Sequence, residues 1–216
     1  MTENNSQPVL KGLILCGGQS RRMQTDKSLL EYGELPQWKY VQRLLEPFVI
    51  NTWISCRKEQ ASLYAETSNL LYDDETSGTA GPAAGMLAAH RRFQETAWLV
   101  VACDLPLVTA DSIKALVTGR AHMLPATAIL NPEKGWPEPL LAIWEPSGLR
   151  ILEKNAGENH YCPRKTLGQC NPRLIKLSDP GELFNANTPA ERALAQRALA
   201  ERAPEEERPV VAARNH

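Results

Sequence analysis

The sequence predicts an α/β protein with a Rossmann-like, three-layer α/β/α architecture and a mostly parallel, twisted sheet. Apolar runs of strand length alternate along the chain with segments that carry apolar residues at helical spacing. The first apolar run ends in a double glycine, which is typical of a buried strand that leaves a sheet through a tight turn. The chain has 216 residues, enough to bury most of its apolar surface in one domain.

The first predicted elements form a β-α-β unit. Apolar residues dominate Val9 to Leu15, which indicates a buried strand. Pro36 comes just before Trp38 to Leu45, where apolar residues recur at helical spacing, and proline is favoured at the start of a helix. Phe48 to Ser55 then alternates like a strand.

The same alternation continues along the chain. We expect further strands at Leu70–Tyr72, Trp98–Cys103, Ala126–Leu130, Pro139–Trp144 and Leu174–Leu177. We expect further helices at Lys58–Glu66, Pro82–Phe93, Asp111–Val117, Ser147–Lys154 and Pro189–Arg202. Helices between successive strands cover both faces of a parallel sheet. We therefore expect one domain over residues 1–202, followed by a disordered, charged and proline-containing C-terminal tail over residues 203–216.

Composition excludes several classes of protein. Lys and Arg number 24 against 25 for Asp and Glu, a formal charge of −1, so no broad cationic surface is available for a nucleic acid. The five cysteines are scattered and form no C-x-x-C pair, which argues against a disulfide framework or a zinc site. No apolar run has the length of a membrane span, and the polar N-terminus lacks the apolar core of a signal peptide. The sequence therefore predicts a cytoplasmic protein.

The loop after the first strand is the candidate ligand site. In an open α/β sheet, ligands bind outside the carboxyl ends of the strands. Gly17 and Gly18 offer backbone N–H groups to anionic oxygens, and Arg21, Arg22 and Lys27 add three cations within a short stretch. A flexible, solvated basic turn is the alternative interpretation of the same residues.

Two familiar phosphate loops do not fit this segment. The dinucleotide pattern G-x-G-x-x-G requires glycines where this chain has Gln19 and Arg22. The Walker pattern requires a glycine before the lysine, and here Asp26 precedes Lys27. The loop is thus neither a standard dinucleotide site nor a P-loop.

From Leu15 to Leu30 the loop reads L-x-G-G-x-S-x-R-M-x-x-D-K-x-L-L. Four further blocks follow in order, at Gly81–Met86, Val101–Leu107, Glu138–Leu140 and Phe184–Pro189. Together these blocks resemble nucleotidyltransferases similar to the molybdenum cofactor guanylyltransferases, over about Leu10 to Arg202. The resemblance implies Mg²⁺-dependent transfer of a nucleoside monophosphate, with GTP as first choice of donor, onto a phosphate-bearing acceptor such as the molybdopterin cofactor. It also implies contacts with other proteins of the molybdenum cofactor pathway.

The resemblance also assigns roles to individual residues. Lys27, Arg22 and Asp104 are the expected catalytic residues, and Asp104 is the expected metal ligand. The residues expected to contact the nucleotide or the acceptor are Leu15, Cys16, Gly17, Gly18, Ser20, Arg21, Asp74, Gly81, Gly85, Asn185 and Asn187.

Asp104 is supported by its position alone. It follows an apolar strand, where a carboxylate is well placed to hold Mg²⁺ against phosphate oxygens. Its alternative role is to cap the next helix, but Thr109 and Asp111 lie nearer the start of that helix.

The other assigned residues also have structural alternatives. Asp74 and its neighbour Asp73 would otherwise form an ordinary acidic turn, and the small residues from Gly81 to Gly85 would serve helix packing. Asn185 and Asn187 lie two apart in an extended segment, so both amides are expected on one face. Thr188 and Pro189 would in addition cap the following helix.

The expected reaction needs no catalytic triad. A phosphate monoester has a second pKa of about 6, so the acceptor is already ionised at neutral pH. Its oxygen can then attack the α-phosphorus of the triphosphate and release pyrophosphate. The alternatives are a cytidylyl- or sugar-phosphate nucleotidyltransferase, or a nucleotide-binding module without turnover.

The chain departs from the family pattern at several positions. Relatives commonly have glycine at Gln24 and often alanine at Cys16, and guanylyltransferases place an asparagine near Ser55. Cys16, Cys56 and Cys103 fall at strand ends that face the candidate site. We therefore expect thiol alkylation to inhibit the protein.

Overall fold

The structure is a computed structural model and describes residues 6–17, 26–73 and 81–202. Its strands are β1 (Leu10–Leu15), β2 (Thr52–Cys56), β3 (Leu70–Tyr72), β4 (Ala97–Ala102), β5 (Ala126–Asn131), β6 (Trp136–Trp144) and β7 (Arg173–Ile175). Its α-helices are α1 (Gln37–Leu45), α2 (Pro82–Arg92), α3 (Ala110–Thr118), α4 (Pro146–Gly157), α5 (Pro163–Gln169) and α6 (Pro189–Arg202). Its 3-10 helices include η1 (Lys27–Leu29), η2 (Lys58–Tyr64) and η4 (Pro180–Leu183).

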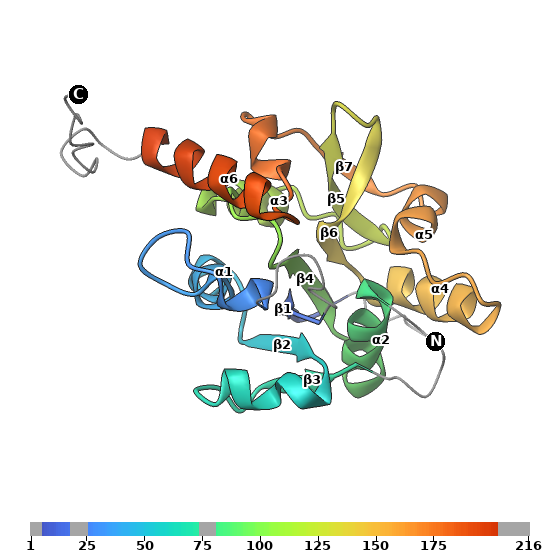
Figure 1. Cartoon of the computed structure of the whole chain (residues 1–216). Helices are drawn as coiled ribbons and strands as arrows, with labels where there is room; N and C mark the ends of the chain where they lie inside the picture. Colours follow the sequence, from blue (N-terminus) through green and yellow to red (C-terminus); the bar gives the residue numbers. More distant parts are fainter. Residues whose placement is uncertain (1–5, 18–25, 74–80, 203–216) are drawn as a thin grey trace, which may run out of the picture.

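The strands of the described residues form one seven-stranded sheet in the order β3-β2-β1-β4-β6-β5-β7 (Figure 1). Neighbouring strands pair in parallel except around β6, which runs antiparallel to both β4 and β5. The predicted mostly parallel sheet is therefore confirmed. The β5–β6 pair is a hairpin, so β6 returns in the opposite direction without a crossover helix.

The core lies on both faces of this sheet. On one face, Trp38 and Val41 of α1 and Ile113 of α3 pack against strand residues such as Ile14 and Val101. On the other face, side chains of α2, α4 and α5 pack against alternate strand residues. Figure 1 shows the helices in these two groups. Alternate residues of β1 and β4 belong to opposite clusters, which is the period-two pattern of a sheet buried on both sides.

Most predicted elements are confirmed, two are corrected, and one helix was missed. The strand expected over Phe48–Ser55 begins only at Thr52, because Phe48 donates to the carbonyl of Leu45 and prolongs the turn after α1. The helix expected over Lys58–Glu66 is the 3-10 helix η2. Helix α5 was not expected from sequence, since its buried residues are only Pro163, Thr166 and Leu167.

Within the described residues, no helix combines the length and apolar composition needed to cross a membrane.

Candidate functional site

A cavity lies at the point where the order in which strands are added to the sheet reverses. From β1 the chain adds β2 and β3 on one side, and then returns to place β4 on the other side of β1. Such a switch point is where open α/β sheets bind their ligands. The cavity has a volume of about 180 Å³ and is lined by Leu15, Cys16, Gly17, Lys27, Ser28, Pro82, Ala102, Cys103, Asp104 and Leu140. Most of these residues sit at the carboxyl ends of β1 and β4 or directly after them.

Lys27 is held at this cavity by the turn that it begins. Asp26 is the N-cap of η1, and its carboxylate accepts from the backbone N–H of Ser28 at 3.0 Å and from the Ser28 hydroxyl at 2.7 Å. The Asp26 carboxylate also accepts from the side-chain amide of Gln60 in η2. The Ser28 hydroxyl lies 2.6 Å from the hydroxyl of buried Tyr64. Asp26 therefore fixes the position of Lys27 through local hydrogen bonds.

The segment before α6 contacts both Lys27 and Asp104. The Nζ of Lys27 donates to the side-chain oxygen of Asn187, although the two residues lie 160 positions apart. The backbone N–H of Ala186 donates to the carbonyl of Asp104 at 2.9 Å. This segment thus connects the strand ends to the lysine.

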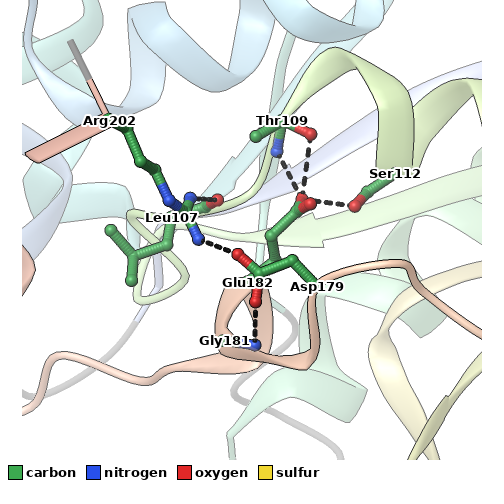
Figure 2. A network of polar contacts seen from close by, with 7 residues as sticks. All are labelled: Leu107, Thr109, Ser112, Asp179, Gly181, Glu182 and Arg202. Atoms are coloured by element: carbon green, nitrogen blue, oxygen red, sulfur yellow. Dashed lines mark hydrogen bonds and ion pairs between the residues drawn. The ribbon is translucent and has the colours of Figure 1, made fainter. Parts of the chain in front are cut away.

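A buried carboxylate anchors that segment to α3 (Figure 2). The Glu182 carboxylate accepts from the backbone N–H of Thr109 at 2.9 Å and from its hydroxyl at 3.0 Å. It also accepts from the hydroxyl of Ser112. Thr109 occupies the N-cap position of α3, but its side chain makes no cap hydrogen bond. Thr109 thus holds the N-cap position that its place in the sequence suggested, but its hydroxyl donates to Glu182 and makes no cap hydrogen bond to α3.

The C-terminal helix is fastened beside this network. Arg202 donates to the carbonyl of Leu107 at 3.0 Å and pairs with Asp179 (Figure 2). At the other end of α6, the backbone N–H of Glu191 donates to the hydroxyl of Thr188 at 3.2 Å, which confirms Thr188 as the cap. Arg202 thus ties the C-terminal end of α6 to Leu107 and Asp179, and Thr188 caps its N-terminal end.

Asp104 is the buried carboxyl group of the cavity. Burial raises the pKa of its carboxyl above the ordinary value, and the positive charge of Lys27 opposes that shift. Its Oδ1 atom is buried and has no hydrogen-bond partner among the described residues. A buried, unpaired carboxylate oxygen is costly unless a ligand or cation satisfies it. The position of Asp104 therefore favours binding of a cation.

Two glycines leave room for side chains near the end of β2: Gly17 for Asp73, and Gly85 for Ser55. A Cβ on Gly17 would lie 2.3 Å from Oδ2 of Asp73. A Cβ on Gly85 would lie 2.0 Å from the hydroxyl oxygen of Ser55. Ser55 in turn donates to Oδ1 of Asp73 at 2.6 Å. Glycine at both positions is therefore a steric requirement of the Ser55–Asp73 contact.

The structure brings together many of the residues expected at the site. Leu15, Cys16, Gly17, Lys27 and Asp104 line one cavity, and Asn187 contacts it through Lys27. Gly81 is the N-cap of α2 and has a positive φ of 72°, directly before the cavity residue Pro82, and Gly85 lies within the first turn of that helix. The expected site residues Gly18, Ser20, Arg21, Arg22 and Asp74 lie outside the described residues.

Asn185 is placed differently from Asn187. Its amide donates to the carbonyl of Leu183 at 3.3 Å, and the residue lines a separate cavity of about 230 Å³. The expectation that the two amides share one face towards one ligand is thus not met by this arrangement, because Asn187 contacts Lys27 instead.

Other contributors to the site are Gln60 and Tyr64, which carried no local sequence signal, and Asp73 and Glu138, which lie in segments that the sequence had singled out. Gln60 and Tyr64 support Lys27 from a distant turn, and Asp73 reaches Gly17 across the sheet. Glu138 is close enough to Asp104 for that charge to raise its pKa, although burial is the larger cause. These pairings depend on strand order, which periodicity does not reveal.

Comparisons with known proteins identify the family of this chain. The family model described as "MobA-like NTP transferase domain" matches residues 12–172. A relative named molybdenum cofactor guanylyltransferase, from Yersinia pseudotuberculosis, is 32% identical over 188 residues, covering 86% of this chain and 94% of the relative. A molybdenum cofactor biosynthesis bifunctional protein from Synechocystis is 31% identical over 186 residues. The match covers 86% of this chain but only 53% of that relative, so the chain spans about half of its length.

Solved structures show the same fold. The molybdopterin-guanine dinucleotide biosynthesis protein A from Archaeoglobus fulgidus superposes with a TM-score of 0.72 at 24% identity, covering 88% of this chain and 99% of that one. A CMP:2-keto-3-deoxy-manno-octonic acid synthetase, solved with CTP, superposes with a TM-score of 0.68 at 12% identity, covering 92% of this chain and 100% of that one.

Proposed function

This chain belongs to the family of MobA-like NTP transferase domains, and on that premise we propose that it transfers a nucleoside monophosphate to a phosphate-bearing acceptor. GTP is the proposed donor and molybdopterin the proposed acceptor, since a relative that matches over 94% of its own length is named molybdenum cofactor guanylyltransferase. Pyrophosphate is the second product.

This proposal rests on one observation: Lys27 and Asp104 line the same cavity, at the switch point between β1 and β4. A cation and a carboxylate at this place suit a triphosphate bound with a divalent metal ion. The N–H of Gly17 donates to the carbonyl of Ser55 at 3.1 Å, so the expectation that it serves anionic oxygens is corrected. Gly18, which lies outside the described residues, remains the proposed backbone donor of the double glycine.

In the proposed reaction, an oxygen of the acceptor phosphate forms a bond to the α-phosphorus of the donor. The bond from that phosphorus to the bridging oxygen of the β-phosphate breaks, and the electron pair leaves with pyrophosphate. The acceptor oxygen is already ionised near neutral pH, because the second pKa of a phosphate monoester is about 6. The protein's task is therefore to align two polyanions and reduce their repulsion.

Lys27 is the residue best placed for that task. Its Nζ is oriented by Asn187, and its backbone is fixed by the Asp26 cap. A cation already held in position stabilises developing negative charge without first paying for its own reorganisation. Arg22 is proposed to assist from the loop, on the strength of the motif alone.

The residues present fit a magnesium ion. Asp104 offers a hard carboxylate oxygen without a partner among the described residues. In the described part of the chain no cluster of three His, Cys, Asp or Glu side chains forms a metal site of its own. Mg²⁺ is commonly held by one or two carboxylates together with substrate phosphates and water. A bound Mg²⁺ would neutralise negative charge on the donor phosphates, and Asp104 is the proposed protein ligand.

Asp73 is proposed as a second acidic contact to the nucleoside, beside or instead of Asp74. Its carboxylate lies against Gly17 and accepts from Ser55, so it faces the start of the glycine loop. A carboxylate in that position suits the hydroxyl groups of a ribose, as in other nucleotide-binding α/β folds. Asp73→Asn should weaken binding of GTP more than binding of pyrophosphate, which has no ribose. Equal losses would count against this role.

One experiment separates the proposed function from its alternatives. The full chain is titrated with GTP, CTP, ATP and UTP in the presence of Mg²⁺, and the melting temperature is followed, because a ligand that binds the native state raises it. We expect the largest increase with GTP. A larger increase with CTP would favour a cytidylyltransferase. Pyrophosphate release is then measured with molybdopterin as acceptor, and nucleotide binding without any release would favour a binding module.

A further inference from the structure

Two cysteine thiols lie close together in the lining of the cavity. The sulfur atoms of Cys16 and Cys103 lie 3.0 Å apart, and both residues are unoxidised in this structure. Both side chains are largely buried, and both line the same cavity of about 180 Å³ as Lys27 and Asp104. Neither sulfur has a role in the reaction proposed above.

The sheet itself places these sulfurs opposite one another. β1 and β4 pair in parallel with Leu15 opposite Ala102, so the next residues on the two strands are Cys16 and Cys103. The N–H of Cys103 continues the ladder by donating to the carbonyl of Leu15 at 3.2 Å. Both cysteines belong to the same core cluster, so their side chains extend from the same face of the sheet. The short contact therefore follows from strand register.

This arrangement is close to that of a disulfide. A disulfide needs an S–S distance of about 2.05 Å and Cα atoms roughly 4.4–6.8 Å apart. Neighbouring strands lie about 4.8 Å apart, within that range. Closing the bond therefore requires the sulfurs to approach by about 1 Å, a local movement at the strand ends that leaves the order and register of the strands unchanged.

We propose that Cys16 and Cys103 form a peroxide-sensitive dithiol, and that its oxidation to a disulfide inhibits the nucleotide site. Burial raises the pKa of the Cys103 thiol above its ordinary value, so Cys16 is the attacking sulfur in this scheme. As thiolate it attacks an oxygen of hydrogen peroxide, the O–O bond breaks, and water leaves after proton transfer. The resulting sulfenic acid is attacked by the second sulfur, the S–O bond breaks, and a second water leaves. Two thiols and one peroxide thus become one disulfide and two waters.

The inhibitory part of this proposal rests on the proposed function. Gly17 and Asp104 directly follow the two cysteines, so drawing the sulfurs together displaces the backbone at both positions. Gly17 has little room on its side-chain side, because an added Cβ would lie 2.3 Å from Oδ2 of Asp73. Asp104 is fixed through its carbonyl to Ala186. A small shift therefore moves Asp104, the proposed metal ligand, and Gly17 away from the positions that their neighbours hold. Misplacement of a reacting group by about 1 Å can cost on the order of 10²-fold in rate.

The test begins with the reduced wild-type protein, treated with hydrogen peroxide and digested without reductant. Mass spectrometry should find a peptide pair that joins Cys16 to Cys103, lighter by two hydrogens than the sum of the separate peptides. Pyrophosphate release should fall at least about tenfold and recover after dithiothreitol. Absence of the Cys16–Cys103 link, or a Cys16–Cys56 link in its place, would overturn the proposal.

Variants separate this crosslink from other oxidation. After peroxide, Cys103→Ala and Cys16→Ala should each retain most of their own reduced-state activity, because one partner is missing. Cys56→Ala should be inhibited like the wild type, although Cys56 is buried on the same face. A link that forms with activity unchanged would overturn the inhibitory role. A reduced protein without transferase activity would instead count against the proposed function, while the peptide map would still test the crosslink.

Discussion

The Nζ atom of Lys27 donates a hydrogen bond to the side-chain oxygen of Asn187, from a position 160 residues earlier in the chain. The contact joins the turn after β1 to the segment that enters α6. Because the Ala186 N–H also donates to the Asp104 carbonyl, the same segment sets the positions of both the cation and the carboxylate. The activity of the cavity should therefore depend on residues close to the C-terminal helix.

Replacing Lys27 with alanine should lower kcat/KM on the order of 10²-fold or more, because a preorganised cation is lost from the phosphate site. Asn187→Ala should lower it by about tenfold to a hundredfold, the worth of a hydrogen bond to a charged group. The double variant should lose little more than Lys27→Ala alone, since both changes remove one interaction. Asn185→Ala is the matched control and should lose less than Asn187→Ala. A near-normal kcat/KM in Lys27→Ala would refute this role.

Asp104→Asn should abolish magnesium-dependent nucleotide binding and yet raise the melting temperature. Burial raises the pKa of this carboxyl in the folded state above that of the unfolded chain, so the folded state binds the proton more tightly. The wild type therefore loses stability as the pH rises from the pKa of Asp104 in the unfolded chain to its higher pKa in the folded state. Above the folded-state pKa the loss is complete. The advantage of Asp104→Asn should be small near pH 4 and larger at pH 7, at about 2–4 °C for each kcal/mol.

Calorimetric melting curves of both proteins over this pH range, without nucleotide, measure the effect. An advantage that shrinks as pH rises would contradict the raised pKa of Asp104. Isothermal titration with GTP and Mg²⁺ tests the binding half of the prediction separately.

Gly85→Ala should destabilise the protein by about 1–3 kcal/mol, because the new methyl group would meet the Ser55 hydroxyl oxygen at 2.0 Å. Ser55→Gly in the same chain should recover part of the loss, since it removes both clashing atoms of that side chain. Gly168→Ala is the control: that glycine has no atom within 4 Å of the added methyl, so alanine should be neutral or stabilising by up to about 1 kcal/mol. Urea denaturation measures the free energy of unfolding of the wild type, the two single variants and the double variant. Equal effects at Gly85 and Gly168 would contradict the steric account.

Glu182→Ala should destabilise the protein by about 2–4 kcal/mol, because it leaves the Thr109 N–H and the Thr109 and Ser112 hydroxyls without their acceptor (Figure 2). Asp179→Ala, at the N-cap of the same 3-10 turn, removes a half-exposed partner of Arg202 and the exposed acceptor of the Gly181 N–H, and should cost less, about 1 kcal/mol. Urea denaturation again provides the measurement. If Asp179→Ala cost as much as Glu182→Ala, the buried carboxylate would not be the anchor of this segment.

Local chemistry explains which parts of the fold were predictable. The apolar run of β1 and the continuous apolar run of β4 carry a strong signal, because both strands are buried on both faces. The capping residue Thr188 was readable, because caps are made by neighbours in sequence. Helix α5 was missed, because its seven residues bury too few apolar side chains to produce a periodic pattern.

By itself the sequence determined the alternation of strands and helices, the glycine and lysine of the loop, and the aspartate that ends a buried strand. These signals are local, since each depends on residues within one or two turns of one another. Only the tertiary structure decided that Asn187 and not Asn185 contacts Lys27, that Glu182 anchors α3, and that Cys16 meets Cys103. Those contacts depend on strand order and register, which are set by packing of the whole sheet and leave no mark on any single segment.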